Sequence, residues 1–550
     1  MLAKEEAERV RKRSFSRPSR RRRHSGRLGS RDDLRPPIEA NDDIEDYDEQ
    51  ELEEIRKIRE AQKAAKQESI IYYDGAVRQY AAGLAGGIGA LSAGSNLGWS
   101  APIMVKLDAH YGGYSFPMTK AQGYWMAAVI ALGAACACYP IGFVMDAIGR
   151  KKTLLSLTVP FLVGWVFVTS ANSVRTLLIG RFITGLGGGG LSVTGPVYAS
   201  EVSQKKMRGS MGSLFQLLLS MGILISVSVR GRANIFVFNC LCTCIPLLFC
   251  SIFIFMPESP KYLVMKGRYA DARAALVKLR SSKHDVDAEL NDIIEKQYTM
   301  RKKIAKHPTF CSRLMHKPAR RTMLICFTLM LFQQLAGFGI VVISAPRVFK
   351  LVGFPLPWTI TTLILVFNHL LATLLFTLVI DHVGRRFLLL LSASLMCTCG
   401  TIIGTIFWLQ EVLDIQNTVF KYVTFLPVIC TFVFVYAYAL GFGSVPWLMA
   451  SELCRMDIKA FVMATAATIS WFLVFVSNNT VFRLIRIIAI YQMFWIYASF
   501  QFTAFFFVYF VVPETKDLSI YDVQHLLRLP LGHVQTRKGP KWSVTVRQKH

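Results

Sequence analysis

The sequence contains one short charged segment twice, and this repetition constrains the fold more than any other feature. The segment Asp-x-x-Gly-Arg, followed by a second base, occupies residues 146–151 and again residues 381–386. Each copy lies between two long apolar stretches. Two apolar halves with matching charged loops are typical of an internally duplicated membrane protein. In transporters such halves move against each other around a central site.

The distribution of charge also indicates a membrane protein. Hydrophobic residues make up 53% of the chain and charged residues only 18%, and the charges gather in the tails, the short loops and one central segment. A soluble protein would spread them over its surface. Apolar runs of about 20 residues predict membrane-spanning helices. The predicted spans are 80–105, 121–145, 153–171, 176–199, 211–229, 235–256, 322–345, 358–380, 387–409, 422–446, 459–478 and 489–512.

The predicted fold class is an all-α membrane protein with twelve transmembrane helices in two pseudo-symmetric six-helix bundles. The bundles are expected over 71–256 and 319–512, with short cytoplasmic linker helices at 257–318. Basic residues are concentrated in alternate loops, which predicts that these loops and both tails, 1–70 and 513–550, face the cytoplasm. No signal-peptide core is visible, so insertion is expected to start at the first internal span. A plasma-membrane location is expected.

The N-terminal tail combines a basic block with an acidic block. Neither block can bury a core, so the tail is predicted to be disordered. Attraction of the basic block to anionic lipid is one interpretation. A docking site for a 14-3-3-type phosphoserine reader at Ser16, within Arg-Ser-Phe-Ser-Arg-Pro at 13–18, is another. Nucleic-acid binding is not expected of a membrane-bound chain.

Neither a metal nor an organic cofactor is expected. Most of the 12 cysteines lie inside predicted spans, and their alternating spacing places neighbours on different helix faces. This pattern suits packing better than metal binding. The chain has no Gly-Lys-Ser/Thr motif for nucleotide phosphates. These features do not indicate an enzyme.

Charged side chains at the predicted cytoplasmic ends of the helices are candidates for a gating network. Carboxylates and guanidiniums there can pair between the two bundles and hold the inner side closed while the outer side is open. Topological anchoring by positive charge is the alternative. The predicted members are Asp146, Arg150, Arg181, Glu201, Arg208, Asp381, Arg385, Arg386, Glu452 and Lys459.

Short motifs along most of the chain carry a family resemblance. They include Gly-Arg-Phe at 180–182, Pro-Val-Tyr-Ala-Ser-Glu at 196–201, Pro-Glu-Ser-Pro at 257–260, Gln-Gln-Leu at 333–335, Pro-Trp at 446–447 and Pro-Glu-Thr-Lys at 513–516. The chain thereby resembles the sugar porter family of the major facilitator superfamily, and within it insect facilitated trehalose and glucose transporters. The resemblance implies a twelve-helix fold and transport of a sugar by alternating access.

The resemblance also implies a central sugar site of amide and aromatic side chains. Amides can both donate to and accept from hydroxyl groups, and an aromatic face can pack on the C–H face of a sugar ring. Hydrogen bonding between helices is the alternative role of each amide. The predicted substrate-binding residues are Gln216, Gln333, Gln334, Trp447, Trp471 and Asn96.

The chain departs from the family pattern at several implied sugar contacts. Gly339 and Val474 stand where amides are expected, and Ala439 stands where an acid is expected. Each lost hydrogen bond is worth about 0.5–1.5 kcal/mol. His369 is expected to be a neutral hydrogen-bonding residue, with a proton relay as the alternative. A carrier of a non-sugar solute and a non-transporting sugar sensor therefore remain alternative functions.

The first span bears on energy coupling. A proton symporter needs a titratable group near its substrate site. Proton-coupled relatives carry an Asp in the first helix where this chain has Asn96, and no acid lies between Asp74 and Asp108. Because an amide cannot exchange a proton near neutral pH, we expect uncoupled, downhill transport.

Overall fold

A computed structural model describes most of the chain between residues 75 and 527. The described residues are 75–103, 114, 116–204, 207–229, 234–281, 284–306, 309–351, 356–412, 425–455, 458–484, 487–516, 518, 523 and 525–527. Ser16 and its phosphoserine motif lie outside this set.

Twelve spanning segments form two sequential sets of six, which confirms the predicted all-α architecture. Eleven described stretches have the length and apolarity of a membrane span, and residues 75–103 form a further helix. After that helix the first set contains α4 (Lys120–Ile148), α5 (Arg150–Ser156) with α6 (Thr158–Thr169), α7 (Val174–Val202), α8 (Arg208–Ser228) and α9 (Ile235–Phe253).

The second set differs from the prediction in two spans that are broken, the seventh and the tenth. Gly337, with a φ of 81°, separates the two helices of the seventh span, a conformation that glycine adopts without strain. The predicted spans at 322–345 and 422–446 are therefore present, but each consists of two helices. The set comprises α14 (Lys317–Gln334) and α15 (Phe338–Leu351), α16 (Trp358–Val383), α17 (Arg385–Glu411), α19 (Leu426–Leu440) and α20 (Val445–Leu453), α21 (Lys459–Leu484) and α22 (Ile490–Val511).

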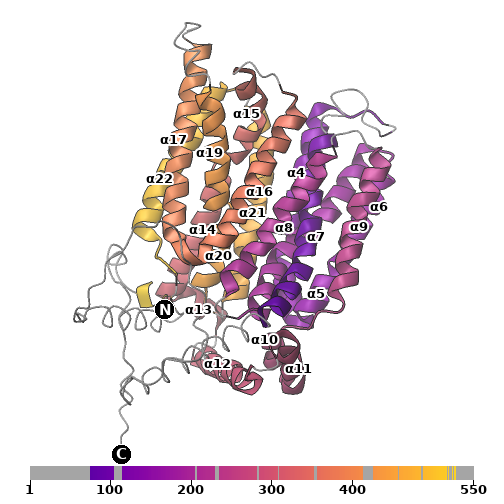
Figure 1. Ribbon diagram of the computed structural model, residues 1–550, viewed down its shortest axis with the longest axis vertical. Coiled ribbons are helices and arrows are strands. Elements are labelled where there is room, and N and C mark those ends of the chain that lie inside the picture. The colour runs from indigo at the N-terminus through magenta and orange to yellow at the C-terminus, as the bar shows by residue number, and fades with distance from the viewer. Residues whose placement is uncertain are drawn as a thin grey trace, which may run out of the picture. The chain divides into compact units, whose positions relative to one another are not determined.

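Four helices, of which α12 is the longest, connect the two sets. They are α10 (Pro260–Met265), α11 (Tyr269–Leu279), α12 (Val286–Lys306) and α13 (Phe310–Met315). Ser259 caps α10 by accepting from the Tyr262 N–H, and proline stands at the start of that helix. These helices lie at one end of the spanning helices, which we call the linker end, and the opposite end is the far end (Figure 1).

Glycines allow α4 and α7 to pack closely within the first set. A Cβ at Gly185 would lie 2.2 Å from the Ile130 carbonyl oxygen, and a Cβ at Gly189 would lie 2.2 Å from that of Ala134. Small residues that let backbones approach are typical of membrane helix pairs. This contact fixes α7, which carries several candidate functional residues, against α4.

The two sets meet along two helix pairs, α4 with α21 and α8 with α16. The ring of Trp125 lies 5.7 Å from that of Phe475, and the ring of Tyr139 lies 6.2 Å from that of Phe461. The two contacts are several turns apart, so α4 and α21 pack along much of their length. Residues that face the partner set along these helices are the natural place to look for a functional site.

Candidate functional site

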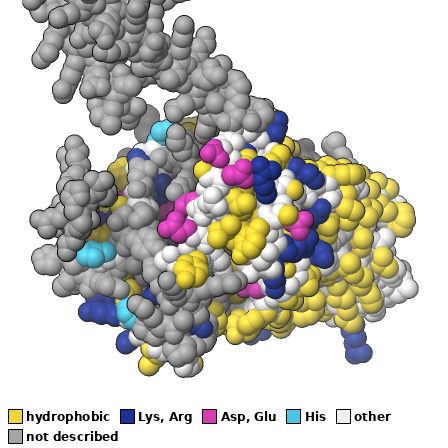
Figure 2. Space-filling model, turned by 90° about the horizontal axis from the view of Figure 1, so that it is seen from below, with side chains coloured by type: hydrophobic (Ala, Val, Ile, Leu, Met, Phe, Trp, Pro, Cys, Tyr) yellow, Lys and Arg dark blue, Asp and Glu magenta, His cyan; other side chains and the backbone are white. Residues whose placement is uncertain are grey.

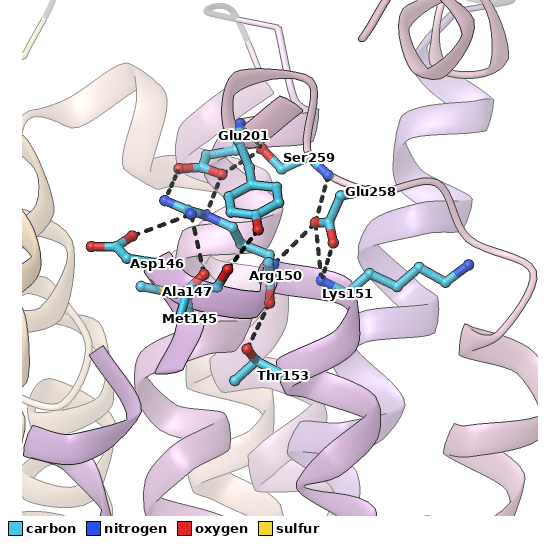
Figure 3. Close-up of polar contacts among 11 residues, drawn as sticks. Met145, Asp146, Ala147, Arg150, Lys151, Thr153, Glu201, Glu258 and Ser259 are labelled. Carbon is cyan, nitrogen blue, oxygen red and sulfur yellow. Dashed lines mark hydrogen bonds and ion pairs between the residues drawn. The ribbon is translucent and has the colours of Figure 1, made fainter. Parts of the chain in front are cut away.

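A buried arginine organises the linker end of the first half (Figure 3). Arg150 exposes 6% of its side chain, and its guanidinium lies 2.9 Å from Glu201 Oε2 and 3.2 Å from Asp146 Oδ1. Its Nη1 also donates to the Met145 carbonyl at 3.4 Å, and the Tyr262 ring covers the guanidinium at 5.2 Å. Two carboxylates therefore neutralise a charge that water scarcely reaches.

Glu258 fixes the turn that brings Arg150 into this cluster. Gly149 has a φ of 100°, which strains other residues, and a Cβ there would lie 2.5 Å from Glu258 Oε2. Glu258 Oε1 accepts from the backbone N–H groups of Arg150 and Lys151, each at 3.0 Å. A carboxylate in this place satisfies the free N–H groups at the start of α5 and complements the helix dipole.

The second half repeats the arrangement. Arg385 exposes 8% of its side chain, lies 3.0 Å from Glu452 and donates to the Ile380 carbonyl at 2.9 Å. Glu514 accepts from the backbone N–H groups of Arg385 and Arg386, each at 3.0 Å. We call Asp146, Arg150, Glu201 and Glu258 the first-half cluster, and Arg385, Glu452 and Glu514 the second-half cluster.

A hydroxyl group completes each cluster. Ser259 Oγ donates to Glu201 Oε2, and Thr515 Oγ1 donates to Glu452 Oε2, each at 2.5 Å. Each hydroxyl residue directly follows the glutamate that caps the helix. The capping segment and the arginine's carboxylate partner are thereby tied to one another in both halves.

The predicted pairing between the halves is wrong for these arginines. Arg150 and Arg385 each pair with a glutamate of their own half, because each capped turn points its arginine at the end of a neighbouring helix in the same bundle. Lys459, the first residue of α21, is half-buried. The side chains of Arg208 and Asp381 lie outside the described set.

Arg181 belongs to a different buried cluster, so its placement in the linker-end network is wrong. It lies near the start of α7, toward the far end, and is fully buried. Its Nη1 donates to Asn96 Oδ1 at 2.6 Å and its Nη2 to Ser100 Oγ at 2.7 Å, while its guanidinium lies 4.8 Å from the Trp99 ring centre. In the described part of the chain no carboxylate forms an ion pair with it.

This cluster also includes Asn96. Asn96, which was predicted to bind substrate, is fully buried here, and its side chain is engaged by Arg181. The neighbouring Trp99 Nε1 donates to Asn239 Oδ1 at 2.8 Å, and Asn239 donates to the Tyr114 hydroxyl at 3.4 Å. Burial raises the pKa of Tyr114 to about 12, so its hydroxyl stays protonated. In this cluster at the far end of the first half, the groups that surround the cation of Arg181 are therefore neutral.

The predicted amides divide into two kinds. Gln333 is 4% exposed and donates to the Gly443 carbonyl at 2.8 Å, so it bonds between helices. Gln334 is half-buried and donates to Ser470 Oγ at 3.2 Å. Gln216 is also half-buried, and none of the described residues hydrogen-bonds with its side-chain amide. Gln216 and Gln334 are thus the amides with the most freedom to meet a ligand.

The two predicted tryptophans have different surroundings. Trp471 is half-buried, and its Nε1 donates to Ser192 Oγ of α7 at 3.0 Å, a bond that joins the two halves. Trp447 is half-buried in α20 and packs against the core of the second half. Trp471 therefore joins the two halves through a hydrogen bond of its ring nitrogen, whereas Trp447 packs within its own half.

An aromatic group lies beside a second polar contact between the halves. Ser220 Oγ of α8 and His369 Nδ1 of α16 are 3.3 Å apart. The Phe338 ring lies 5.7 Å from that of His369 and stacks on Tyr438 at 4.8 Å. Gly339 is exposed, and a Cβ there would meet no atom within 4 Å. The break in the seventh span therefore borders open space.

The comparison with family models decides the family. A model described as "Sugar (and other) transporter" matches residues 74–527, most of the chain. The chain belongs to this sugar transporter family. The resemblance drawn from its motifs is confirmed.

Among the relatives of this family member are facilitated trehalose transporters of insects. It is 30% identical over 453 residues to the facilitated trehalose transporter Tret1 of Apis mellifera ligustica, covering 82% of this chain and 89% of that protein. It is 29% identical over 458 residues to Tret1 of Aedes aegypti, covering 83% of this chain and 56% of that protein. It therefore spans about half the length of the longer relatives.

A solved structure confirms the fold of this family member. The major facilitator superfamily proton:xylose symporter XylE, bound to 6-bromo-6-deoxy-D-glucose, superposes with a TM-score of 0.67 at 20% identity. The match covers 82% of this chain and 100% of that one. At this identity the likeness shows the twelve-helix fold and nothing about the substrate.

Among the described residues no group of three or more His, Cys, Asp or Glu side chains could hold a metal ion. The cysteines in the described ranges are free. The expected lack of a cofactor stays a prediction.

Sequence reasoning missed the residues that complete these sites. Glu258 and Glu514 stand in family motifs, but the motifs alone do not show that they cap α5 and α17. Their positions just before a hydroxyl residue in both halves could have indicated a shared role. Ser192 and Ser220 carry no such signal, because a serine in an apolar helix has no distinctive pattern.

Proposed function

We propose that this protein carries a small sugar or polyol across the membrane, down its gradient, by alternating access. The observation that carries the proposal is the pair of polar contacts between the halves, Ser220 with His369 and Ser192 with Trp471. Each can break when the halves separate and re-form when they close. In transporters built from repeats, substrates bind where the repeats meet.

Trehalose and hexoses are the first candidate substrates, because the relatives are named for facilitated trehalose transport. Gln216 and Gln334 offer amides that can donate to and accept from sugar hydroxyls. The stacked pair of Phe338 and Tyr438 offers an aromatic surface for the C–H face of a ring. Open space at Gly339 leaves room beside that surface.

A carrier of a non-sugar solute is the second candidate. The observation that favours it is the open and unfunctionalised position at Gly339, together with apolar Ala439 and Val474. A sugar sensor that binds without transporting is a third interpretation. It rests on the unusual charged tail, which lies outside the described residues.

Transport is proposed to be uncoupled from protons. Asn96 is an amide, and within the described ranges no carboxylate forms an ion pair with the buried Arg181 to which it bonds. No proton can therefore be exchanged at this pair near neutral pH. His369 bonds to a serine hydroxyl, which is consistent with a neutral imidazole.

Further parts of the proposal concern location and partners. The protein is placed in the plasma membrane with both termini in the cytoplasm, it catalyses no reaction, and Ser16 is a docking point for a 14-3-3-type protein. Its spanning helices contact the lipid bilayer, and nucleic acid is not a partner. Access of tag-specific antibodies to either terminus in intact cells would contradict this topology.

Uptake of labelled trehalose, glucose, polyols and non-sugar solutes in a host lacking its own carriers tests the function. Saturable uptake of a sugar supports the proposal, and uptake of another solute alone supports the second candidate. Binding without uptake supports a sensor. The Gln216→Ala variant should raise the KM for the substrate, whereas Gln333→Ala, at a bond between helices, should chiefly lower the amount of folded protein.

Accumulation of substrate above its outside concentration tests the coupling. We expect none, and a protonophore should leave uptake unchanged. If accumulation occurs and a protonophore abolishes it, uncoupled transport is wrong. His369→Ala should then remove accumulation while exchange persists.

A further inference from the structure

The linker end of the first half has an apolar rim at the end of a spanning helix. The exposed apolar surface of α9 continues past the helix to Ile254 and Phe255, whose side chains are 53% and 79% exposed. On the linker helix α11, Val277 is 49% exposed. Large apolar side chains this exposed at the end of a membrane helix are positioned to contact lipid rather than water.

Three lysines stand at this rim. Lys151 Nζ donates to the Ile254 carbonyl at 2.7 Å, and its side chain points away from the first-half cluster (Figure 3). Lys278 lies close enough for its charge to act on Lys151, and it follows Val277 in α11. Lys152 is the next residue of α5 and is exposed. Seen from the linker end, basic side chains border the apolar surface (Figure 2).

These lysines differ from two arginines of the linker that pair with carboxylates. Arg268 pairs with Asp271 and Arg273 with Asp287, each at 2.7 Å. Within the described ranges no carboxylate forms an ion pair with Lys151, Lys152 or Lys278. Glu258 is the carboxylate whose charge acts on Lys151, but its oxygens are occupied by backbone N–H groups. The rim therefore carries more positive than negative charge, because the single carboxylate of Glu258 acts on three lysines at most.

We propose that Lys151, Lys152 and Lys278, the lysine rim, bind the phosphate of an anionic phospholipid. The acyl chains of that lipid would lie against Phe255 and Val277. Lysine side chains can lay their aliphatic stems on apolar surface while the ammonium groups reach the headgroup level, and ammonium groups bind phosphate as point charges. The apolar side chains beside the lysines favour a lipid over a dissolved anion.

Such a lipid would connect parts of the chain that are distant in sequence. Lys151 and Lys152 belong to a spanning segment, whereas Lys278 belongs to linker helix α11. One phosphate held by both would fasten the linker to the first half at the membrane surface. Anionic lipid is thereby expected to stabilise the docked position of α11, independently of the transported substrate.

Binding of fluorescent phosphatidylserine to the purified full-length protein in phosphatidylcholine nanodiscs tests the proposal. Replacing Lys152 and Lys278 together by glutamine should weaken binding by about tenfold or more, as the loss of two charges at a membrane surface implies. A matched control, Arg273→Gln with Lys296→Gln, removes the same charge from linker residues that already pair with carboxylates. It should change binding by less than about twofold.

Three results would overturn the proposal. They are unchanged binding in the rim variant, an equal loss in the control variant, and displacement of the lipid by millimolar inorganic phosphate, which would indicate a free-anion site. If the glutamine variant does not fold, Lys152→Arg with Lys278→Arg decides, because it keeps the charge and must keep the binding. Raising phosphatidylserine should also protect α11 from proteolysis in the native protein and not in the rim variant.

Discussion

The charge clusters of the two halves share their chemistry but differ in the element that closes them. In the first half, Tyr262 of linker helix α10 covers Arg150 and donates to the Ala147 carbonyl at 3.0 Å. In the second half, the ring of Tyr509 in the spanning helix α22 lies 5.7 Å from Arg386, the residue that follows the cluster arginine Arg385. The first cluster is therefore covered by a residue of the linker, whereas the aromatic ring beside the second belongs to a helix of the bundle itself.

The clusters also differ in how far water reaches them. The side chain of Glu201 is 11% exposed and that of Glu452 is 25% exposed. Duplication has preserved the arginine, its glutamate and the capping carboxylate, and the surroundings have diverged. The capped turn is common to both halves, whereas the residues that pack around it differ.

Removing the central arginines should have the largest effect. Arg150→Gln and Arg385→Gln each leave a largely buried glutamate without its cation, at a cost of about 3–5 kcal/mol of folding free energy. The loss should be greater for Arg150, because Glu201 is the less exposed partner. Thermal melting of the purified full-length protein measures it. A larger drop in Tm for Arg385→Gln would contradict the ranking.

The next effect concerns the buried ion pair between Arg280 and Glu289, through which the linker contacts the end of α7. Arg280 is 2% exposed, donates twice to Glu289, each at 2.8 Å, and donates to the Val202 carbonyl at the end of α7 at 2.9 Å. Arg280→Met should cost about 2 kcal/mol, as expected for a buried pair with one partly exposed partner. Limited proteolysis between α11 and α12 should accelerate. Arg273→Met, at an exposed pair, is the control and should leave the cleavage rate unchanged.

Removing the capping carboxylates should have a smaller effect that is equal in the two halves. Glu258→Ala and Glu514→Ala each free two backbone N–H groups at a helix start, at a cost of about 1–2 kcal/mol. Because the distances from the two caps match, the losses of Tm should match as well. A loss confined to one half would show that the two caps are not equivalent.

The sequence predicted the clusters but not their partners. The repeated Asp-x-x-Gly-Arg segments correctly marked two turns, since glycine is required at the φ of 100° found at Gly149 and of 96° found at Gly384. Whether Arg150 pairs within or between the halves depends on how the helices pack, which a linear pattern does not contain. The assignment of Arg181 failed for a simpler reason, because α7 begins at Val174 and places that residue near the far end.

The spans and the candidate substrate site show the same limit. Apolar runs predicted twelve spans, but they could not reveal the break at Gly337, because hydropathy is continuous across it. The sequence also could not show which of the two adjacent glutamines is buried. Gln333 and Gln334 are adjacent and chemically identical, yet the turn of the helix buries one and leaves the other half-exposed.

The smallest effect isolates the bond by which the linker touches the first-half cluster. Tyr262→Phe removes the hydroxyl that donates to Ala147 and keeps the ring over Arg150, so it should cost about 0.5–1.5 kcal/mol. Burial raises the pKa of Tyr262 above its usual value near 10. The advantage of the native protein over the variant should therefore be complete below pH 10 and disappear as the pH rises through the raised pKa. Tyr269→Phe, at an exposed tyrosine of α11, is the control and should match the native protein in Tm. Equal melting of the Tyr262→Phe variant and the native protein below pH 10 would show that the ring alone closes the first cluster, and that the bond from the Tyr262 hydroxyl to Ala147 adds nothing to the coupling of the linker.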